Sequence, residues 1–259
     1  MNTLSVIVIT KDEEDRLDRC LSSVQDIADE IVVVDSGSTD NTVNIAKKYT
    51  DKVLVTDWPG YGPQKQRALE QATCDWVLSI DADEALDENA KLSVNKLLQQ
   101  TKISASAYRL PWKTIFLGKS IRFGRSARSP KRLFRREGAS FSQDLVHEKV
   151  ITSGSTQTID KGYLLHYSVR NFEHLLEKNR KYSWLTSEKY YKKNKKSYGV
   201  YVAVLRSLIT FIQIYIFRLG FLDGSRGLIL AGMFTQRTFN KYVGLWSLET
   251  QEKMQSDKD

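Results

Sequence analysis

The sequence has few cysteines and none of the segments that mark a secreted or repetitive protein. Its two cysteines, Cys20 and Cys74, form no Cys-x-x-Cys motif, so we expect core thiols in a reducing compartment. No basic segment precedes the first apolar run, Leu4–Thr10, and charged residues follow it directly, which predicts a first β-strand and not a signal peptide. The sequence also lacks internal repeats and a long low-complexity linker, which excludes a repeat architecture.

Length and charge are the first positive features. A chain of 259 residues is long enough for a sizeable core and fits one large α/β domain, or one domain with an appendage. Its hydrophobic fraction of 41% is well above the disordered range. The formal net charge of +8 indicates an anionic partner, which leaves nucleic acid, a phosphorylated sugar and anionic lipid as candidates.

The first half of the chain alternates strand and helix patterns. Leu4–Thr10 is continuously apolar, as in a strand buried on both faces, and Leu17, Cys20 and Leu21 recur at helical spacing. This alternation predicts βαβ units and a mainly parallel sheet. Further on, alternating cations and apolar residues predict an exposed strand at 131–136. The other strands are expected at 30–35, 52–56, 76–80, 105–110 and 115–116, and the helices at 14–26, 41–49, 64–73 and 88–100.

The chain changes character near residue 170, so we divide it into a domain at 1–170 and a basic helical region at 171–259. After a basic stretch, residues 199–217 are almost wholly apolar, with Arg206 in a polar stripe. For a membrane-spanning helix, a central arginine costs roughly 2.5–3.5 kcal/mol. We therefore expect an amphipathic helix in a membrane interface, with its basic residues toward anionic headgroups. A homodimer contact, or packing on the first domain, is the alternative.

Two short motifs place carboxylates where predicted strands end. One strand runs into Asp35 and a tight turn at Gly37, and another runs into Asp81 and Asp83. In an open parallel sheet such strand ends lie on one edge, where ligands bind. Oxygen ligands as dense as Asp81 and Asp83 suit a hard divalent cation that also holds phosphates. The sequence thus predicts a nucleotide at the first strand end and a metal-bound diphosphate at the second.

These motifs resemble a known family. Val34-Asp35-Ser36-Gly37-Ser38-Thr39-Asp40, the opening Ile9-Thr10-Lys11-Asp12-Glu13, and Asp81-Ala82-Asp83 resemble glycosyltransferase family 2, the inverting enzymes of GT-A fold. The resemblance is most specific over residues 1–85. It implies an α/β GT-A fold, with a Rossmann-like, mainly parallel central sheet flanked by helices and a helical C-terminal membrane-associating extension.

The resemblance also implies roles for the donor-binding residues. Asp35 is expected to accept the uracil N–H of a uridine diphosphate sugar, next to the turn at Gly37. Thr10 and Glu13 are the expected base or ribose contacts, and Asp81 is expected to approach the ribose or the metal. Lys65 and Arg67 follow a loop rich in glycine and proline, so they are expected to meet the nucleotide or its phosphates, with a solvated helix start as the alternative.

The same resemblance implies a metal and a base. Asp83 is the expected ligand of Mg²⁺ or Mn²⁺, and His166 is either a further metal or diphosphate contact or a structural histidine. Such a transferase needs a carboxylate that removes the proton of the acceptor hydroxyl. Glu148 is the first candidate for this base and Asp144 the second, unless Glu148 merely pairs with a neighbouring cation such as Arg132.

Residues further along the chain indicate the class of acceptor. The pair His147-Glu148 and the segments at 218–227 and 241–246 resemble the lipopolysaccharide inner-core β-1,4-glucosyltransferase subfamily. The Gln-x-x-Arg-Trp signature of processive synthases is absent, which favours single addition. We therefore expect a peripheral, metal-dependent enzyme at the cytoplasmic face of the bacterial inner membrane. It would move glucose from UDP-glucose to an inner-core heptose of lipopolysaccharide.

Three other functions are weighed against this one. A polyprenyl phosphate or another cell-surface glycan as acceptor is the nearest alternative. A sugar-nucleotide sensor without catalysis is the second, if Glu148 is misplaced. A nucleic-acid-binding protein is the third, because aromatic residues interleaved with cations at 173–198 could stack bases. A binding module has no need of Asp81 and Asp83, however, and no recognition motif is present, so no nucleic-acid partner is expected.

Overall fold

The computed structural model describes residues 2–124, 129–142 and 148–256. The chain divides into two compact units, and each is described by itself. The sheet unit comprises Met1–Thr114 and Arg128–Ser168, and the helical unit comprises Ile115–Ala127 and Val169–Asp259. The second unit thus begins near the predicted position 170, but it also takes in a segment from the middle of the chain.

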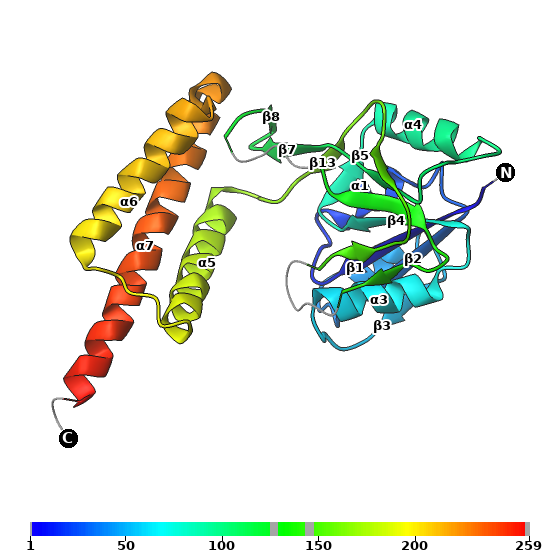
Figure 1. Ribbon diagram of the computed structural model, residues 1–259. Helices are drawn as coiled ribbons and strands as arrows, with labels where there is room; N and C mark the ends of the chain where they lie inside the picture. The colour runs from blue at the N-terminus through cyan, green and yellow to red at the C-terminus, as the bar shows by residue number, and fades with distance from the viewer. Residues whose placement is uncertain (1, 125–128, 143–147, 257–259) are drawn as a thin grey trace. The chain divides into compact units, whose positions relative to one another are not determined.

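A seven-stranded sheet forms the centre of the sheet unit (Figure 1). Strand β1 pairs in parallel with β2 and β4, and β2 pairs in parallel with β3, as the βαβ pattern predicts. Strand β9 is antiparallel to both β4 and β6. The order is β12-β6-β9-β4-β1-β2-β3, with β1 Leu4–Thr10, β2 Glu30–Asp35, β3 Val53–Val55, β4 Trp76–Asp81, β6 Ala107–Arg109, β9 Lys131–Arg135 and β12 Thr156–Thr158.

Helices cover both faces of this sheet, which is why β1 is apolar throughout. Its Val6 and Val8 pack with α1 (Leu17–Ser22), α2 (Thr42–Ala46) and α4 (Glu88–Leu98), whereas Ile7 and Ile9 pack with α3 (Tyr61–Gln71). Each buried methylene contributes about 0.8 kcal/mol, so these two apolar layers hold the unit together. The predicted α/β fold with a mainly parallel central sheet is confirmed.

Strand β9 corrects one prediction. The alternation at 131–136 predicts an exposed strand, but β9 lies inside the sheet and Arg132, Leu133 and Phe134 are buried. Leu133 packs on one face of the sheet and Phe134 on the other. The prediction is wrong because it treats every cation as solvated, whereas Arg132 is neutralised by carboxylates inside the protein.

Two smaller sheets complete the strands. One has the order β5-β13-β7-β8 and places His166 opposite Glu84 in an antiparallel pair; the other pairs β10 with β11. Their bounds are β5 Glu84–Leu86, β7 Trp112–Phe116, β8 Lys119–Ile121, β10 Ser140–Phe141, β11 Val150–Ile151 and β13 Leu164–His166. Cys20 is a buried free thiol, as expected, whereas the free thiol Cys74 is half-buried.

Three helices make up most of the helical unit, and α7 packs against both others (Figure 1). They are α5 (Phe172–Lys192), α6 (Val200–Ile212) and α7 (Gly224–Ser256), with a π-helical turn η1 (Gln213–Phe217) and a 3₁₀ turn η2 (Gly220–Asp223) between the last two. The α5–α7 contact is made by small and polar residues. Asn179 donates to the Met233 carbonyl at 3.1 Å and Ser187 to the Lys241 carbonyl at 2.8 Å. At Gly244 a β-carbon would lie 2.5 Å from the Ser187 hydroxyl, so glycine permits the close approach.

Helix α6 contacts α7 through residues of its polar stripe. The Arg206 guanidinium bonds the Tyr242 hydroxyl of α7 at 3.2 Å, and the Thr210 and Thr238 hydroxyls are 3.2 Å apart. Two members of the stripe thus contact α7, whereas Arg206 itself stays exposed, and the placement of the basic residues toward headgroups stays a prediction. The opposite side, called here the α6 outer face, exposes large apolar side chains: Tyr201, Val204, Leu205, Leu208, Ile209 and Ile212.

Candidate active site

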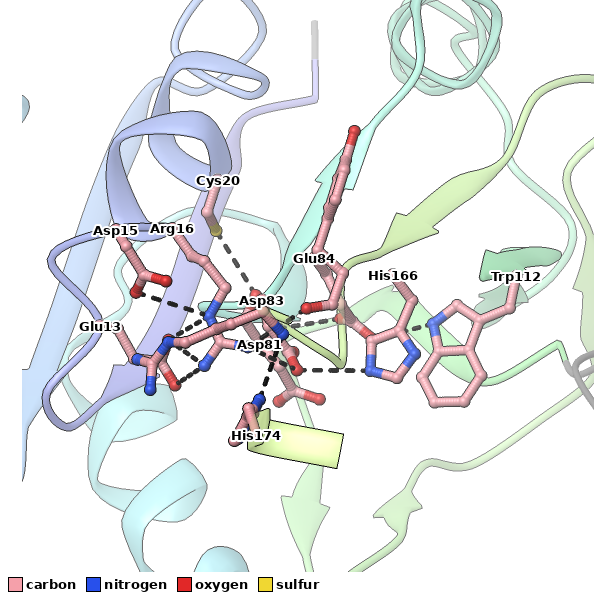
Figure 2. Close-up of polar contacts among 12 residues, drawn as sticks. Glu13, Asp15, Arg16, Cys20, Asp81, Asp83, Glu84, Trp112, His166 and His174 are labelled. Carbon is pink, nitrogen blue, oxygen red and sulfur yellow. Dashed lines mark hydrogen bonds and ion pairs between the residues drawn. The ribbon is translucent and has the colours of Figure 1, made fainter. Parts of the chain in front are cut away.

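Several carboxylates gather at one edge of the large sheet. The strand register places Thr10 beside Asp35 and Ile9 beside Asp81, so the ends of β1, β2 and β4 are level. Figure 2 shows Asp81, Asp83 and Glu84 together with Arg16 and His166 at this edge. Because these strands are parallel, the edge carries their carboxyl ends, which is where open α/β sheets bind ligands.

The end of β2 is shaped by its own aspartate. The fully buried Asp35 carboxylate accepts from the Gly37 and Ser38 N–H groups at 2.9 and 2.8 Å and also from the Ser38 hydroxyl. Gly37 has a φ of 79°, a left-handed conformation that favours glycine. Thr10 is only 5% exposed, and among the described residues its hydroxyl has no hydrogen-bond partner. An orphaned hydroxyl beside Asp35 fits a site in which a polar ligand supplies the missing bond.

The loop after β1 is tied to the loop after β2. The Asp12 carboxylate accepts from the Thr39 N–H at 2.8 Å, and the Asp12 N–H donates to the Ser38 hydroxyl at 2.8 Å. Glu13 forms a two-bond pair with Arg16, whose Nε and Nη2 each lie 2.6 Å from a carboxylate oxygen. The predicted base or ribose contact Glu13 is therefore held by Arg16 at this edge.

Asp81 is held between two cations. Its Oδ1 lies 2.7 Å from Lys65 Nζ of α3, and its Oδ2 lies 2.6 Å from Arg132 Nη2 of β9. Burial by itself raises the pKa of Asp81, but the charges of Arg132 and Lys65 outweigh it and hold that pKa well below its usual range. Asp81 is thus a carboxylate kept ionised by the protein's own cations.

Glu84 is the buried carboxylate of the cluster. It accepts from Arg132 Nη2 at 2.6 Å, from the Trp112 indole N–H at 2.8 Å, and from the Asp81 N–H at 2.9 Å. Burial raises the pKa of Glu84, and the charges of Asp81 and Asp83 act in the same direction against that of Arg132. With all its oxygens engaged inside the protein, Glu84 supports the site and does not face a ligand.

Asp83 and His166 form the other end of the cluster. His166 Nε2 lies 3.5 Å from Asp83 Oδ2, and the Trp112 ring stacks on the imidazole with centroids 4.4 Å apart and an angle of 3° between the planes. The Arg16 guanidinium lies 3.8 Å from the same carboxylate. Burial raises the pKa of Asp83, but the bond and charge of His166 and the charge of Arg16 lower it overall.

A carboxylate and an imidazole side by side are a donor set that suits a divalent cation whose remaining ligands are phosphates and water. Asp83 and His166 therefore fit the expected metal. Within the described ranges, no group of three or more such side chains is arranged to hold a metal ion, so a bound phosphate or water would have to complete the coordination.

The remaining candidates fall in different places. Glu148 comes to the site and its Oε1 accepts from Lys65 Nζ at 2.7 Å. Arg67 instead donates to the Asp57 carboxylate at 2.8 Å and the Thr56 hydroxyl at 3.1 Å, because residues two apart on a helix point about 200° apart. Asp144 lies outside the described residues.

Sequence reasoning missed three residues of this site: Arg16, Trp112 and Arg132. For Arg132 the signal was a cation directly before the apolar pair Leu133-Phe134 on a strand. Arg16 lies three positions after Glu13, which is pairing distance on a helical turn. Nothing local marks Trp112, since its partners Glu84 and His166 come from distant parts of the chain.

The fold and the site define an α/β enzyme with an acidic site at the carboxyl edge of a parallel sheet, and sequence comparison gives its family. The model of glycosyl transferase family 2 matches residues 5–149. An uncharacterised glycosyltransferase of Rickettsia typhi is 31% identical over 98% of this chain and 90% of its own. The chain belongs to glycosyltransferase family 2.

A second relative has a named pathway. The lipopolysaccharide core biosynthesis glycosyltransferase LpsC of Rhizobium meliloti is 29% identical over 93% of each chain. Among solved structures, TarS of S. aureus matches with a TM-score of 0.46 and 21% identity over 69% of this chain and 38% of its own. Glucosyl-3-phosphoglycerate synthase of Mycobacterium tuberculosis matches with a TM-score of 0.34 and 26% identity over 45% of each chain.

Proposed function

We propose that the protein is an inverting, metal-dependent hexosyltransferase that moves glucose from UDP-glucose to an inner-core heptose of lipopolysaccharide. One observation carries the proposal. The Thr10 hydroxyl, which has no hydrogen-bond partner among the described residues, lies with Asp35 on one side of the sheet edge, and Asp83 lies with His166 on the other. The acceptor class is supported by the full-length similarity to a lipopolysaccharide core glycosyltransferase.

Each part of the site has one task in this reaction. Thr10 and Asp35 would hold the uridine, and Asp83 and His166 would hold the metal with the donor diphosphate. When bound, a divalent cation supplies Lewis-acid stabilisation of the departing diphosphate. Glu148 takes the proton of the acceptor hydroxyl as that oxygen attacks the anomeric carbon from the face opposite the leaving group.

Experimentally, a donor-by-acceptor panel tests this function. Purified full-length protein is incubated with UDP-glucose, UDP-galactose or UDP-N-acetylglucosamine and truncated lipopolysaccharides, and the products are read by mass spectrometry. We expect one added hexose from UDP-glucose on acceptors that end in inner-core heptose. Transfer to a polyprenyl phosphate instead would keep the chemistry and replace the acceptor, and no transfer from any UDP-sugar would overturn the proposal.

We further propose that the helical unit binds the cytoplasmic face of the inner membrane through the α6 outer face. Val200–Phe217 is the one segment of the described chain that is long and apolar enough to cross a membrane, with a mean hydropathy of 1.9. Exposed lysines precede it directly, and they suit anionic headgroups: Lys192, Lys193, Lys195 and Lys196.

Lying on the bilayer is favoured over spanning it by the pairing of α6 with α7. Thr210 contacts Thr238 and Arg206 contacts Tyr242, so Arg237 and Lys241 of α7 lie level with the middle of α6. A spanning pair of helices would carry these cations into hydrocarbon, at roughly 2.5–3.5 kcal/mol each. In the interface plane, the apolar outer face inserts while the cations stay at the headgroup level.

A further inference from the structure

Lys65 is a buried lysine shared by two carboxylates. It is 3% exposed, and its Nζ lies 2.7 Å from Asp81 Oδ1 and 2.7 Å from Glu148 Oε1. The two partners come from distant parts of the chain: Asp81 ends β4, and Glu148 precedes β11. A lysine is almost never fully buried unless it is paired, so these contacts are the reason the ammonium tolerates its position.

Neighbouring side chains fix the helix that carries Lys65. The Gln64 amide donates to the Ser36 hydroxyl at 3.0 Å, which ties α3 to the loop after β2. Arg67 ties the same helix to Asp57, and Ala68 packs in the apolar layer below the sheet. These ties hold α3, and with it the Lys65 ammonium, in one position. From there the ammonium donates to the Glu148 carboxylate.

Charge balance argues against Lys65 as a ligand of the donor phosphates. The connected cluster contains two cations, Lys65 and Arg132, and three carboxylates, Asp81, Glu84 and Glu148. The cluster thus has no surplus positive charge. A diphosphate that took Lys65 would leave Asp81 with Arg132 but would deprive the Glu148 carboxylate, whose side chain is 16% exposed, of this cation, which is unfavourable.

We infer that Lys65 is a positioning residue that fixes Glu148 against the end of β4, so that the carboxylate stands where the acceptor hydroxyl must lose its proton. This inference rests on the proposed function, in which Glu148 is the base. Lys65 acts through Glu148, whereas a phosphate ligand would act on the donor. Misplacing a reacting group by about 1 Å can cost about 10²-fold in rate, so the loss of Lys65 should lower turnover on that scale.

Three substitutions of lysine test the inference: Lys65→Met, Lys65→Arg and, as the matched control, Lys91→Met. Lys91 also contacts two carboxylates, Glu88 and Asp26, but it lies on α4 outside the site. We expect Lys65→Met to lower kcat about 10²-fold while the affinity for UDP, measured by titration calorimetry, stays near the wild-type value. Lys65→Arg keeps the charge and should restore part of the rate, and Lys91→Met should change neither quantity.

A double variant separates the two roles. If Lys65 acts through Glu148, adding Lys65→Met to the Glu148→Gln enzyme should cause only a small further loss of rate. The effects of substitutions at two interacting residues are not additive. The double variant removes the charges of both Lys65 and Glu148, so it leaves neither without its partner and remains informative if Lys65→Met alone folds poorly. A full additional loss in the double variant, or a UDP affinity that falls together with kcat, would overturn the inference.

Hydrogen exchange supplies a readout that does not depend on activity. Lys65→Met should raise amide exchange in residues 148–151 relative to wild type and Lys91→Met, since the anchor of that segment is lost. Unchanged exchange there would contradict the positioning role even if turnover fell. If Lys65→Met raises exchange but the wild-type protein transfers no sugar, the contact between Lys65 and Glu148 is supported and the proposed function is overturned.

Discussion

The sheet unit and the helical unit differ in the side chains that their elements bury and expose. The sheet unit buries Leu, Val and Ile on both faces of its strands and gathers charge at one edge. In the helical unit the buried contacts of α5 and α6 include Asn179, Ser183, Ser187, Ala203 and Ser207, while the α6 outer face exposes leucine and isoleucine. Small residues at helix contacts and large apolar residues outside also occur where helices meet lipid, which supports the proposed membrane contact.

This difference supports the proposal that the chain works in two surroundings, water and a membrane surface. Water solvates the sheet unit, whose charged edge needs a polar ligand, whereas the α6 outer face gains free energy only when lipid or protein covers it. The proposed transfer to a lipid-anchored acceptor would use both properties. Each variant below changes residues of only one of the two units.

The largest effect is expected from the predicted base in the sheet unit. Glu148→Gln should lower kcat roughly 10²–10⁴-fold, because the amide cannot take the acceptor's proton. Its UDP affinity should be retained, as measured by calorimetry. Glu137→Gln, an exposed glutamate of the same unit, is the control. Near-normal turnover in Glu148→Gln would move the base to another residue.

Next in size is the loss of the buried cation behind the site. Arg132→Met leaves Asp81 and Glu84 without their shared partner, which should lower the free energy of unfolding by about 3–5 kcal/mol in urea titrations. Arg136→Met removes an exposed arginine that bonds the Cys74 carbonyl and should cost far less. Equal stability of the two variants would show that the buried cluster does not hold the sheet unit together.

Membrane binding by the helical unit should not respond to these substitutions in the sheet unit, but it should respond to substitutions on the α6 outer face. Leu205→Glu with Leu208→Glu should reduce co-sedimentation with anionic vesicles more than about tenfold, since each buried leucine contributes about 1.5–3 kcal/mol. Leu92→Glu, at an exposed leucine of α4, is the matched control. High salt should release part of the wild-type protein, because exposed charge contacts are screened.

If the wild-type chain ignores anionic vesicles at low salt, the α6 outer face packs on protein instead. A second copy of the chain would then be the occupant to examine by light scattering, and the membrane proposal would be wrong.

The smallest effect concerns the amino end of β2. Burial raises the pKa of Glu30, but bonds from Lys52, Ser5 and Thr73 lower it overall, from 4.5 to about 2. A depressed carboxylate pKa stabilises the fold above pH 4.5, and the contribution disappears as the pH falls toward about 2. Glu30→Gln should therefore cost about 1–2 kcal/mol at pH 7, after allowance for screening, and progressively less in acid. A pH-independent difference would contradict this assignment.

Much of the fold follows from local patterns. Leu4–Thr10 and Glu30–Asp35 are predicted with their true bounds because the apolar runs Val6–Ile9 and Ile31–Val34 mark strands buried on both faces. The helix expected at 88–100 is likewise found, as α4 (Glu88–Leu98), and Asp87 caps it by accepting from the Ala90 N–H at 2.8 Å. The pairing of Lys65 with Glu148 and the burial of Arg132 could not be predicted, because both depend on contacts between distant segments.

The central claim is that the acidic edge of the sheet unit is a metal-dependent site for a UDP-sugar. Titration calorimetry of UDP with the full chain, in Mn²⁺ and then in chelator, tests it most directly. We predict tight binding in Mn²⁺, weak binding in chelator, and loss of the metal-dependent part in Asp83→Asn. Equal UDP affinity with and without the metal in the wild-type protein would contradict the claim.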